Sequence, residues 1–76
     1  MGVAVVLPQL GFSMAEGRLV SWLAANDAPV ERGTPLYELE SDKAIQTIES
    51  PTAGRLRIMA AADAVYAVGT VLGEIV

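Results

Sequence analysis

The middle of the chain reads LYELESDKAIQTIE, from Leu36 to Glu49, and has the pattern of a β-hairpin. Apolar and polar side chains alternate from Tyr37 to Glu40, and a two-residue turn at Asp42 and Lys43 would join this strand to the one that follows. The predicted register pairs Tyr37 with Ile48, Leu39 with Gln46, Glu38 with Thr47 and Glu40 with Ile45. The first two pairs share one face of the hairpin, and this face is expected to supply most of the core.

Other short apolar runs flank the hairpin, and each has the length and composition of a β-strand. They are Val3–Leu7, Arg18–Ala24, Arg55–Met59 and Val71–Val76. Apolar residues make up 53% of the chain, which is too much for a disordered segment. Only Ala60–Ala62 leans toward helix, and Asp63 follows it at once. The sequence therefore predicts an all-β domain.

The chain also contains an internal repeat. Residues 27–36 (DAPVERGTPL) align with residues 63–72 (DAVYAVGTVL), and residues 13–19 (SMAEGRL) align with residues 50–56 (SPTAGRL). Shared turn chemistry at two unrelated Gly-Thr corners is the alternative explanation. Two similar halves, each too small to bury its own apolar face, must pack together. We predict a flattened β-barrel or sandwich of roughly eight strands with a pseudo-twofold axis. Turns are expected near Gly17, Gly33, Gly54 and Gly69.

Composition excludes several classes of function. The 76 residues fit one domain, and the absence of Cys and His excludes disulfides, zinc sites and catalysis by thiol or imidazole. A net charge of −4 argues against nucleic-acid binding, which needs a basic surface. No apolar run reaches the roughly 18–20 residues of a membrane helix, so a soluble intracellular domain is expected.

Lys43 is the only lysine, and it falls between the two repeats. A two-residue hairpin turn prefers Asn-Gly or Asp-Gly, because its second residue favours a positive φ. Lysine at that position breaks the local rule, and such departures are where function is expected. A solvated charge beside Glu40 and Asp42 is the alternative interpretation, since exposed ion pairs contribute only about 0–1 kcal/mol.

The residues around Lys43 resemble a known family. Glu40-Ser41-Asp42-Lys43-Ala44 is similar to the E-[ST]-D-K-A hairpin of lipoyl domains, the swinging-arm modules of 2-oxo acid dehydrogenase complexes. The resemblance covers most of the chain and extends over further segments in the same order. These are Leu7–Gly11, Ser13–Gly17, Leu19–Leu23 (I-V-x-W-L), Val30–Leu36 (V-x-x-G-x-P-L) and Glu49–Gly54 (E-[SA]-P-x-[AS]-G).

The resemblance implies a fold and a role. The fold would be a barrel-sandwich hybrid of two four-stranded antiparallel sheets, with Lys43 at a hairpin tip and the termini together at the far end. Lys43 would carry lipoate in amide linkage. The arm would accept an acyl group from a thiamine-diphosphate decarboxylase (E1), pass it to an acyltransferase core (E2) and coenzyme A, and be reoxidised by dihydrolipoamide dehydrogenase. Because the chain has no Cys, a cofactor must carry this disulfide chemistry. The domain itself would be a carrier and not an enzyme.

Two sets of residues would then be recognised by partner enzymes. Lipoate–protein ligase or lipoyl synthase, and the decarboxylase, would read the hairpin residues Glu40, Ser41, Asp42 and Ala44. The loop residues Leu10, Gly11, Phe12, Ser13, Met14 and Glu16 would face the decarboxylase.

Three departures from the family pattern are visible in the sequence. Phe12 replaces an acidic or small polar loop residue, which indicates an unusual partner preference. Gln46 replaces an apolar residue, so either Gln46 is half-buried with a hydrogen bond or Ile45 lies exposed in a contact patch. Asp-Ala stands in place of a Gly-Asp turn at residues 27–28 and 63–64, which leaves the turn type open.

The remaining alternatives concern what the domain carries. A biotin carrier shares the fold, but its lysine is typically flanked by Met, whereas Lys43 is flanked by Asp42 and Ala44. An unmodified β-barrel that only binds protein partners is a second alternative, and a small enzyme using Glu38 and Glu40 is a third. We expect a monomeric domain that is the N-terminal piece of a longer dihydrolipoyllysine acyltransferase, for pyruvate or acetoin. The expected location is the bacterial cytoplasm, with the mitochondrial matrix as the other possibility.

Overall fold

The computed structural model describes residues 2–41 and 44–76, and these residues form strands, turns and loops. No helix long and apolar enough to cross a membrane occurs within that described part. The eight strands are β1 (Val3–Val6), β2 (Glu16–Trp22), β3 (Pro29–Val30), β4 (Pro35–Glu40), β5 (Ile45–Glu49), β6 (Gly54–Ile58), β7 (Ala64–Ala67) and β8 (Val71–Ile75).

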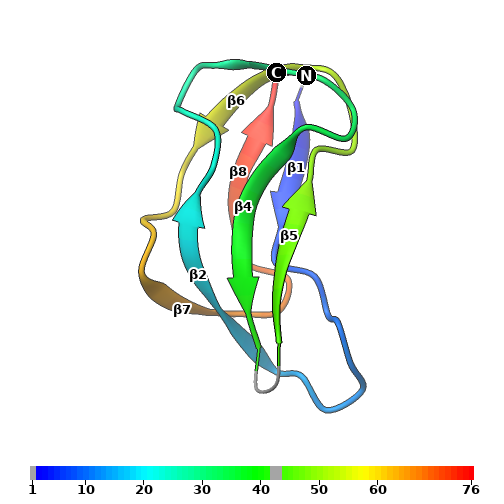
Figure 1. The fold of residues 1–76 in the computed structure, drawn as a ribbon, viewed down its shortest axis with the longest axis vertical. Coiled ribbons are helices and arrows are strands. Elements are labelled where there is room, and N and C mark those ends of the chain that lie inside the picture. The colour runs from blue at the N-terminus through cyan, green and yellow to red at the C-terminus, as the bar shows by residue number, and fades with distance from the viewer. Residues whose placement is uncertain (1, 42–43) are drawn as a thin grey trace.

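The strands form two four-stranded sheets, and every pairing is antiparallel (Figure 1). One sheet has the order β1-β8-β6-β3, and the other has the order β5-β4-β2-β7. The sheets enclose one core of buried apolar side chains, namely Val5, Leu7, Leu19, Val30, Leu36, Tyr37, Leu39, Leu56, Leu72 and Ile75. Each such Leu contributes roughly 1.5–3 kcal/mol through burial. The predicted all-β sandwich of two four-stranded antiparallel sheets is confirmed.

The two sheets are related by the internal repeat. Replacing each strand by the one four places further along the chain converts the order β1-β8-β6-β3 into β5-β4-β2-β7. Gly33 and Gly69 occupy matching turns and share the same φ of 91°, in the region that favours glycine. Asp27 and Asp63 also match, with φ values of 68° and 63°, a left-handed conformation that Asp tolerates better than most residues. The predicted pseudo-twofold symmetry is confirmed.

Polar contacts between the two halves follow the same symmetry. The backbone N–H of Asp27 donates to Leu56 O at 2.5 Å, and that of Asp63 donates to Leu19 O at 2.6 Å. The carboxylate of each aspartate pairs with an arginine of the other half. Arg55 Nη1 lies 3.8 Å from Asp27 Oδ2, and Arg18 pairs with Asp63. Each half thus closes a turn of its partner.

Two details differ from the prediction. Gly17 was expected near a turn, but it lies inside β2. A Cβ at this position would stand 2.8 Å from Leu39 Cδ1 and 2.9 Å from Met14 Cε. Glycine at this position serves close packing. The sequence patterns also did not predict β3 and β7 individually, although the expected total of about eight strands is confirmed.

Candidate functional site

The hairpin between β4 and β5 has the predicted register. Tyr37 pairs with Ile48, Leu39 with Gln46, Glu38 with Thr47, and Glu40 with Ile45. Beyond the strands, Ser41 N donates to Ala44 O at 2.9 Å, and Ser41 Oγ donates to the same oxygen at 3.3 Å. These two bonds hold together the backbone on either side of Asp42 and Lys43. Both Asp42 and Lys43 lie outside the described residues.

The inner strand of the hairpin is firmly anchored in the protein. Tyr37 and Leu39 are completely buried in the core, and β4 is hydrogen-bonded to β5 on one side and β2 on the other. Tyr37 also packs edge-on against the ring of Trp22, with the ring centroids 5.3 Å apart. The residues that flank Asp42 and Lys43 are therefore attached to a rigid support.

The acidic side chains of β4 are held on its outer face. Arg18 Nη1 lies 3.6 Å from Glu40 Oε1, and Ser21 Oγ donates to Glu38 Oε1 at 3.2 Å. Neither glutamate lines the hollow described below. The interpretation of Glu38 and Glu40 as the acid and base of a small enzyme gains no support from this placement.

The question left open at Ile45 and Gln46 is resolved by the exposure of both side chains. Ile45 is 58% exposed, and Gln46 is exposed as well, although its partner Leu39 is buried. Gln46 is therefore not the half-buried, hydrogen-bonded side chain of the first alternative. The edge strand β5 presents both residues at the surface, next to Ala44.

The loop between β1 and β2 lies at the same end of the domain as the hairpin, below β4 and β5 in Figure 1. Hydrogen bonds within the loop fix its shape. Gln9 Nε2 donates to Phe12 O at 3.4 Å and to Met14 O at 3.2 Å. Leu10 N donates to Met14 Sδ at 3.2 Å, and Met14 N donates to Gly11 O at 3.2 Å. Phe12 is fully exposed at the tip of this organised loop.

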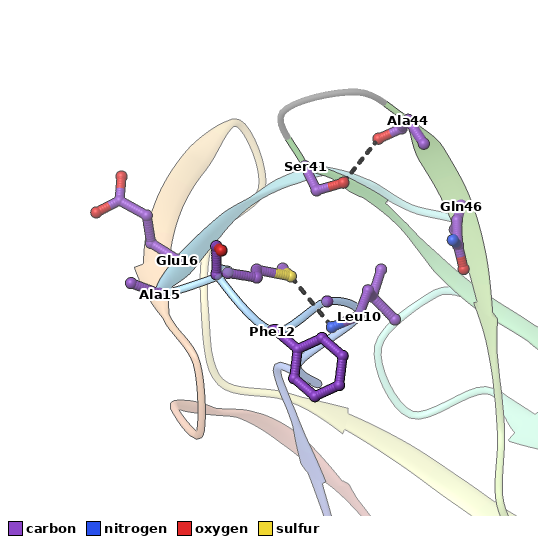
Figure 2. Close-up of a pocket in the computed structure, with 10 residues that line it drawn as sticks. Leu10, Phe12, Ala15, Glu16, Ser41, Ala44 and Gln46 are labelled. Atoms are coloured by element: carbon purple, nitrogen blue, oxygen red, sulfur yellow. Dashed lines mark hydrogen bonds between the residues drawn. The ribbon is translucent and has the colours of Figure 1, made fainter.

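The loop and the hairpin enclose an open groove between them (Figure 2). Its lining residues are Leu10, Gly11, Phe12, Ser13, Met14, Ala15, Glu16, Ser41, Ala44 and Gln46. All six loop residues singled out in the sequence thus meet Ser41 and Ala44 in one place, whereas Glu40 lies outside the groove. Sequence reasoning did not assign Ala15 or Gln46 to a site. The departure at position 46 was the one available signal.

Comparison with known proteins gives three findings. A model of the biotin and lipoyl family, described as "Biotin-requiring enzyme", matches residues 3–75. The acetyltransferase component of the Corynebacterium glutamicum pyruvate dehydrogenase complex is 40% identical over 72 residues, or 93% of this chain and 11% of that protein. The corresponding component of the Pseudomonas putida acetoin cleaving system is 33% identical over 73 residues, or 95% of this chain and 20% of that protein.

A solved structure supports the fold. The lipoyl domain of the Azotobacter vinelandii 2-oxoglutarate dehydrogenase complex superposes with a TM-score of 0.81 at 20% identity, covering 97% of this chain and 95% of that one. The chain spans between 11% and 20% of the length of the curated relatives it matches.

Proposed function

The chain belongs to the biotin and lipoyl attachment family, whose model covers residues 3–75, and on that premise we propose that it is a lipoyl carrier domain with Lys43 as the attachment residue. One observation carries the choice of residue. The only lysine of the sequence falls between Ser41 and Ala44, which are joined by a backbone hydrogen bond where β4 and β5 end. Attachment in a lipoyl carrier would need a lysine, and the sequence offers one.

The described residues around Lys43 suit a long apolar group. The strands behind it are anchored by buried side chains, so an arm attached there can move without disturbing the core. The groove beside Ser41 and Ala44 has apolar side chains in part of its lining, those of Leu10, Phe12, Met14 and Ala44. Lipoate, when attached, supplies the disulfide and dithiol chemistry of acyl transfer, for which this Cys-free chain has no side chain of its own.

The surface around the attachment lysine is the part of the domain that partner enzymes would contact. Glu40, Ser41, Asp42 and Ala44 would be read by the attaching enzyme, a lipoate–protein ligase or lipoyl synthase. The loop residues Leu10, Gly11, Phe12, Ser13, Met14 and Glu16 would contact the decarboxylase. An exposed aromatic side chain on a preorganised loop is a typical anchor for a protein partner, and Phe12 has both properties.

We further propose that the domain serves the acyltransferase component of a bacterial 2-oxo acid or acetoin dehydrogenase complex in the cytoplasm. The relatives in Corynebacterium glutamicum and Pseudomonas putida are components of such systems, and they support this assignment. The partners would be a thiamine-diphosphate decarboxylase, the acyltransferase core and dihydrolipoamide dehydrogenase. The domain would carry the acyl group among them and catalyse no step alone.

Intact-mass analysis tests the attachment. The chain is co-expressed with lipoate–protein ligase and lipoate, and the expected result is a mass increase of one lipoyl group. The K43R variant keeps a positive charge at this position and should gain no mass. An unchanged mass in the native chain, or an equal gain in K43R, would refute the proposal.

Biotin attachment is tested in parallel with biotin ligase in place of lipoate–protein ligase. The native chain should remain unmodified, whereas a variant carrying D42M and A44M should shift toward biotin. Efficient biotinylation of the native chain would replace the lipoyl proposal with the biotin carrier alternative.

A further inference from the structure

We propose that the groove between residues 10–16 and the hairpin is a resting site for the dithiolane ring of the chain's own lipoyl arm. The inference rests on the proposed function, because it needs lipoate on Lys43. It goes beyond that function, because residues 10–16 would bind the lipoyl group of the same molecule. The arm would lie against Leu10, Phe12 and Met14 whenever no partner enzyme holds it.

The first support is the position of the groove. Ser41 and Ala44, which line it, are the residues on either side of the two-residue segment that contains Lys43. An arm rooted in that segment starts at the edge of the groove. Tethering gives such a ligand an effective concentration in the millimolar range, so a contact too weak to bind free lipoate is sufficient to hold the arm.

The second support is the chemistry of the lining. Leu10, Phe12, Met14 and Ala44 give the groove an apolar part beside its polar residues Ser13, Ser41 and Gln46, and Glu16 is its only charged residue among those described. In Figure 2, Leu10 is drawn between the Phe12 ring and Gln46, and all three residues line the groove. A dithiolane is apolar and contains sulfur, and sulfur makes favourable contacts with aromatic rings such as that of Phe12. The groove therefore matches the end of the arm.

The third support is the organisation of the loop. Gln9 Nε2 donates to two loop carbonyls, and Leu10 N donates to Met14 Sδ. The loop is already shaped before any ligand arrives, so binding does not require it to be ordered first. At the same time Phe12 is left fully exposed to water, and covering its ring removes apolar surface from solvent.

A protein partner would also cover Phe12, but the groove favours the arm as its occupant in the free domain. The hairpin wall of the groove lies within three residues of Lys43 in the sequence, and a tethered group forfeits little translational freedom on binding. The arm is therefore expected to occupy the groove in the isolated domain, which can be measured without partner enzymes.

The experiment compares lipoylated and unmodified domain by amide NMR, after intact mass has verified the loading. Lipoylation should shift the amide signals of residues 10–16 and of Ala44–Gln46, while distant residues such as Met59 keep their positions. The domain lipoylated in the F12A variant should show smaller shifts in Leu10 and Met14. F12A should fold as the native chain does, because Phe12 is fully exposed and is not part of the core.

A second readout is the rate at which a water-soluble phosphine reduces the dithiolane. The phosphine becomes a phosphine oxide as the disulfide gains two electrons and two protons. We expect F12A to be reduced about threefold faster than the native holo-domain, the ratio for an arm bound roughly two thirds of the time. The matched control M59A removes another exposed apolar side chain outside the groove and should leave the rate unchanged.

The outcomes separate the two proposals. A verified lipoyl mass with unshifted loop amides, or with equal reduction rates in F12A and the native domain, would overturn the resting site and leave the carrier function standing. Faster reduction in M59A as well as F12A would also overturn it, because the effect would not be specific to the groove. A chain that gains no lipoyl mass would overturn the carrier function itself.

Discussion

The titration of Tyr37 offers a test of how tightly the hairpin is packed into the core. Its side chain is completely buried, and burial raises its pKa from 10.0 to about 12. Its hydroxyl donates to Val6 O at the long distance of 3.5 Å, which offsets little of the desolvation. The protonated form is therefore strongly preferred in the folded state.

The sign of the pH effect follows from the two pKa values. Below pH 10 the tyrosine is protonated in both states, and its contribution to stability is fully present. Between pH 10 and pH 12 the unfolded chain loses this proton while the folded chain keeps it, so the free energy of unfolding falls. Two pKa units correspond to about 3 kcal/mol, a large part of the 5–15 kcal/mol typical of a whole domain.

The Y37F variant removes this titration and keeps the ring. Near pH 8 it should be less stable than the native chain by about 1 kcal/mol or less, because it loses one long hydrogen bond. Above pH 11 it should be the more stable of the two, so the two stability curves cross. Urea unfolding between pH 8 and pH 12 measures both curves, with Trp22 as the fluorescent probe beside residue 37.

The Y66F variant is the matched control, because the Tyr66 hydroxyl also donates to a backbone carbonyl, that of Ala61, while Tyr37 remains intact. It should keep the alkaline loss of stability. Parallel pH curves for the native chain and Y37F would refute the reasoning, since they would mean that Tyr37 ionises without penalty in the folded state.

Four other substitutions, at three positions, test the packing, the turns and the surface. L56A should lower the free energy of unfolding by about 2–5 kcal/mol in urea titration, because Leu56 is completely buried. G69A should lower it by about 1–2 kcal/mol through its φ of 91°, since a Cβ there meets no neighbour within 4 Å and the cost is conformational, and G69N should lower it by less, because Asn tolerates a positive φ better than Ala. R18Q should lower the melting temperature by only a few degrees, because its ion pairs with Asp63 and Glu40 are exposed, and a loss above about 2 kcal/mol would contradict this assignment.

The hairpin register was predictable because the alternation from Tyr37 to Glu40 and a two-residue turn at Asp42 and Lys43 together allowed one solution. A shift by one residue would have turned Glu38 and Glu40 inward and exposed Tyr37 and Leu39. The repeat was visible for a related reason, since matching turns need matching residues. Gly33 and Gly69 share one φ value, and so nearly do Asp27 and Asp63.

Other features depend on neighbours that no local pattern records. The two-residue strand β3 is too short for any periodicity, and the Ala-rich β7 forms because β2 offers it a pairing edge. The sequence predicts a turn at Gly17, whereas glycine is needed there because the side chains of Leu39 and Met14 pack against its Cα in the folded protein. The groove arises where the β1–β2 loop meets the hairpin, so Ala15 and Gln46 could be assigned to it only from the fold.

The symmetry of the fold explains why the hairpin is suited to carry a group. Shifting each strand by four places turns the β4–β5 connection into the end of β8 and the start of β1, where the chain ends lie. Figure 1 shows both chain ends at one pole and the ends of β4 and β5 leading toward the other, along a body 32 Å in its longest dimension. Only one pole can therefore contain a continuous hairpin.

The two poles also differ in charge. Arg18 pairs with Glu40, but Arg55, its counterpart in the other half, faces the position of Val76 and pairs only with Asp27 among the described residues. The added ion pair ties β4 to β2 next to Ser41, the last described residue before Asp42 and Lys43. β4 is in turn hydrogen-bonded to β5 of the second half, so residues of both halves hold the end of β4 that precedes Ser41.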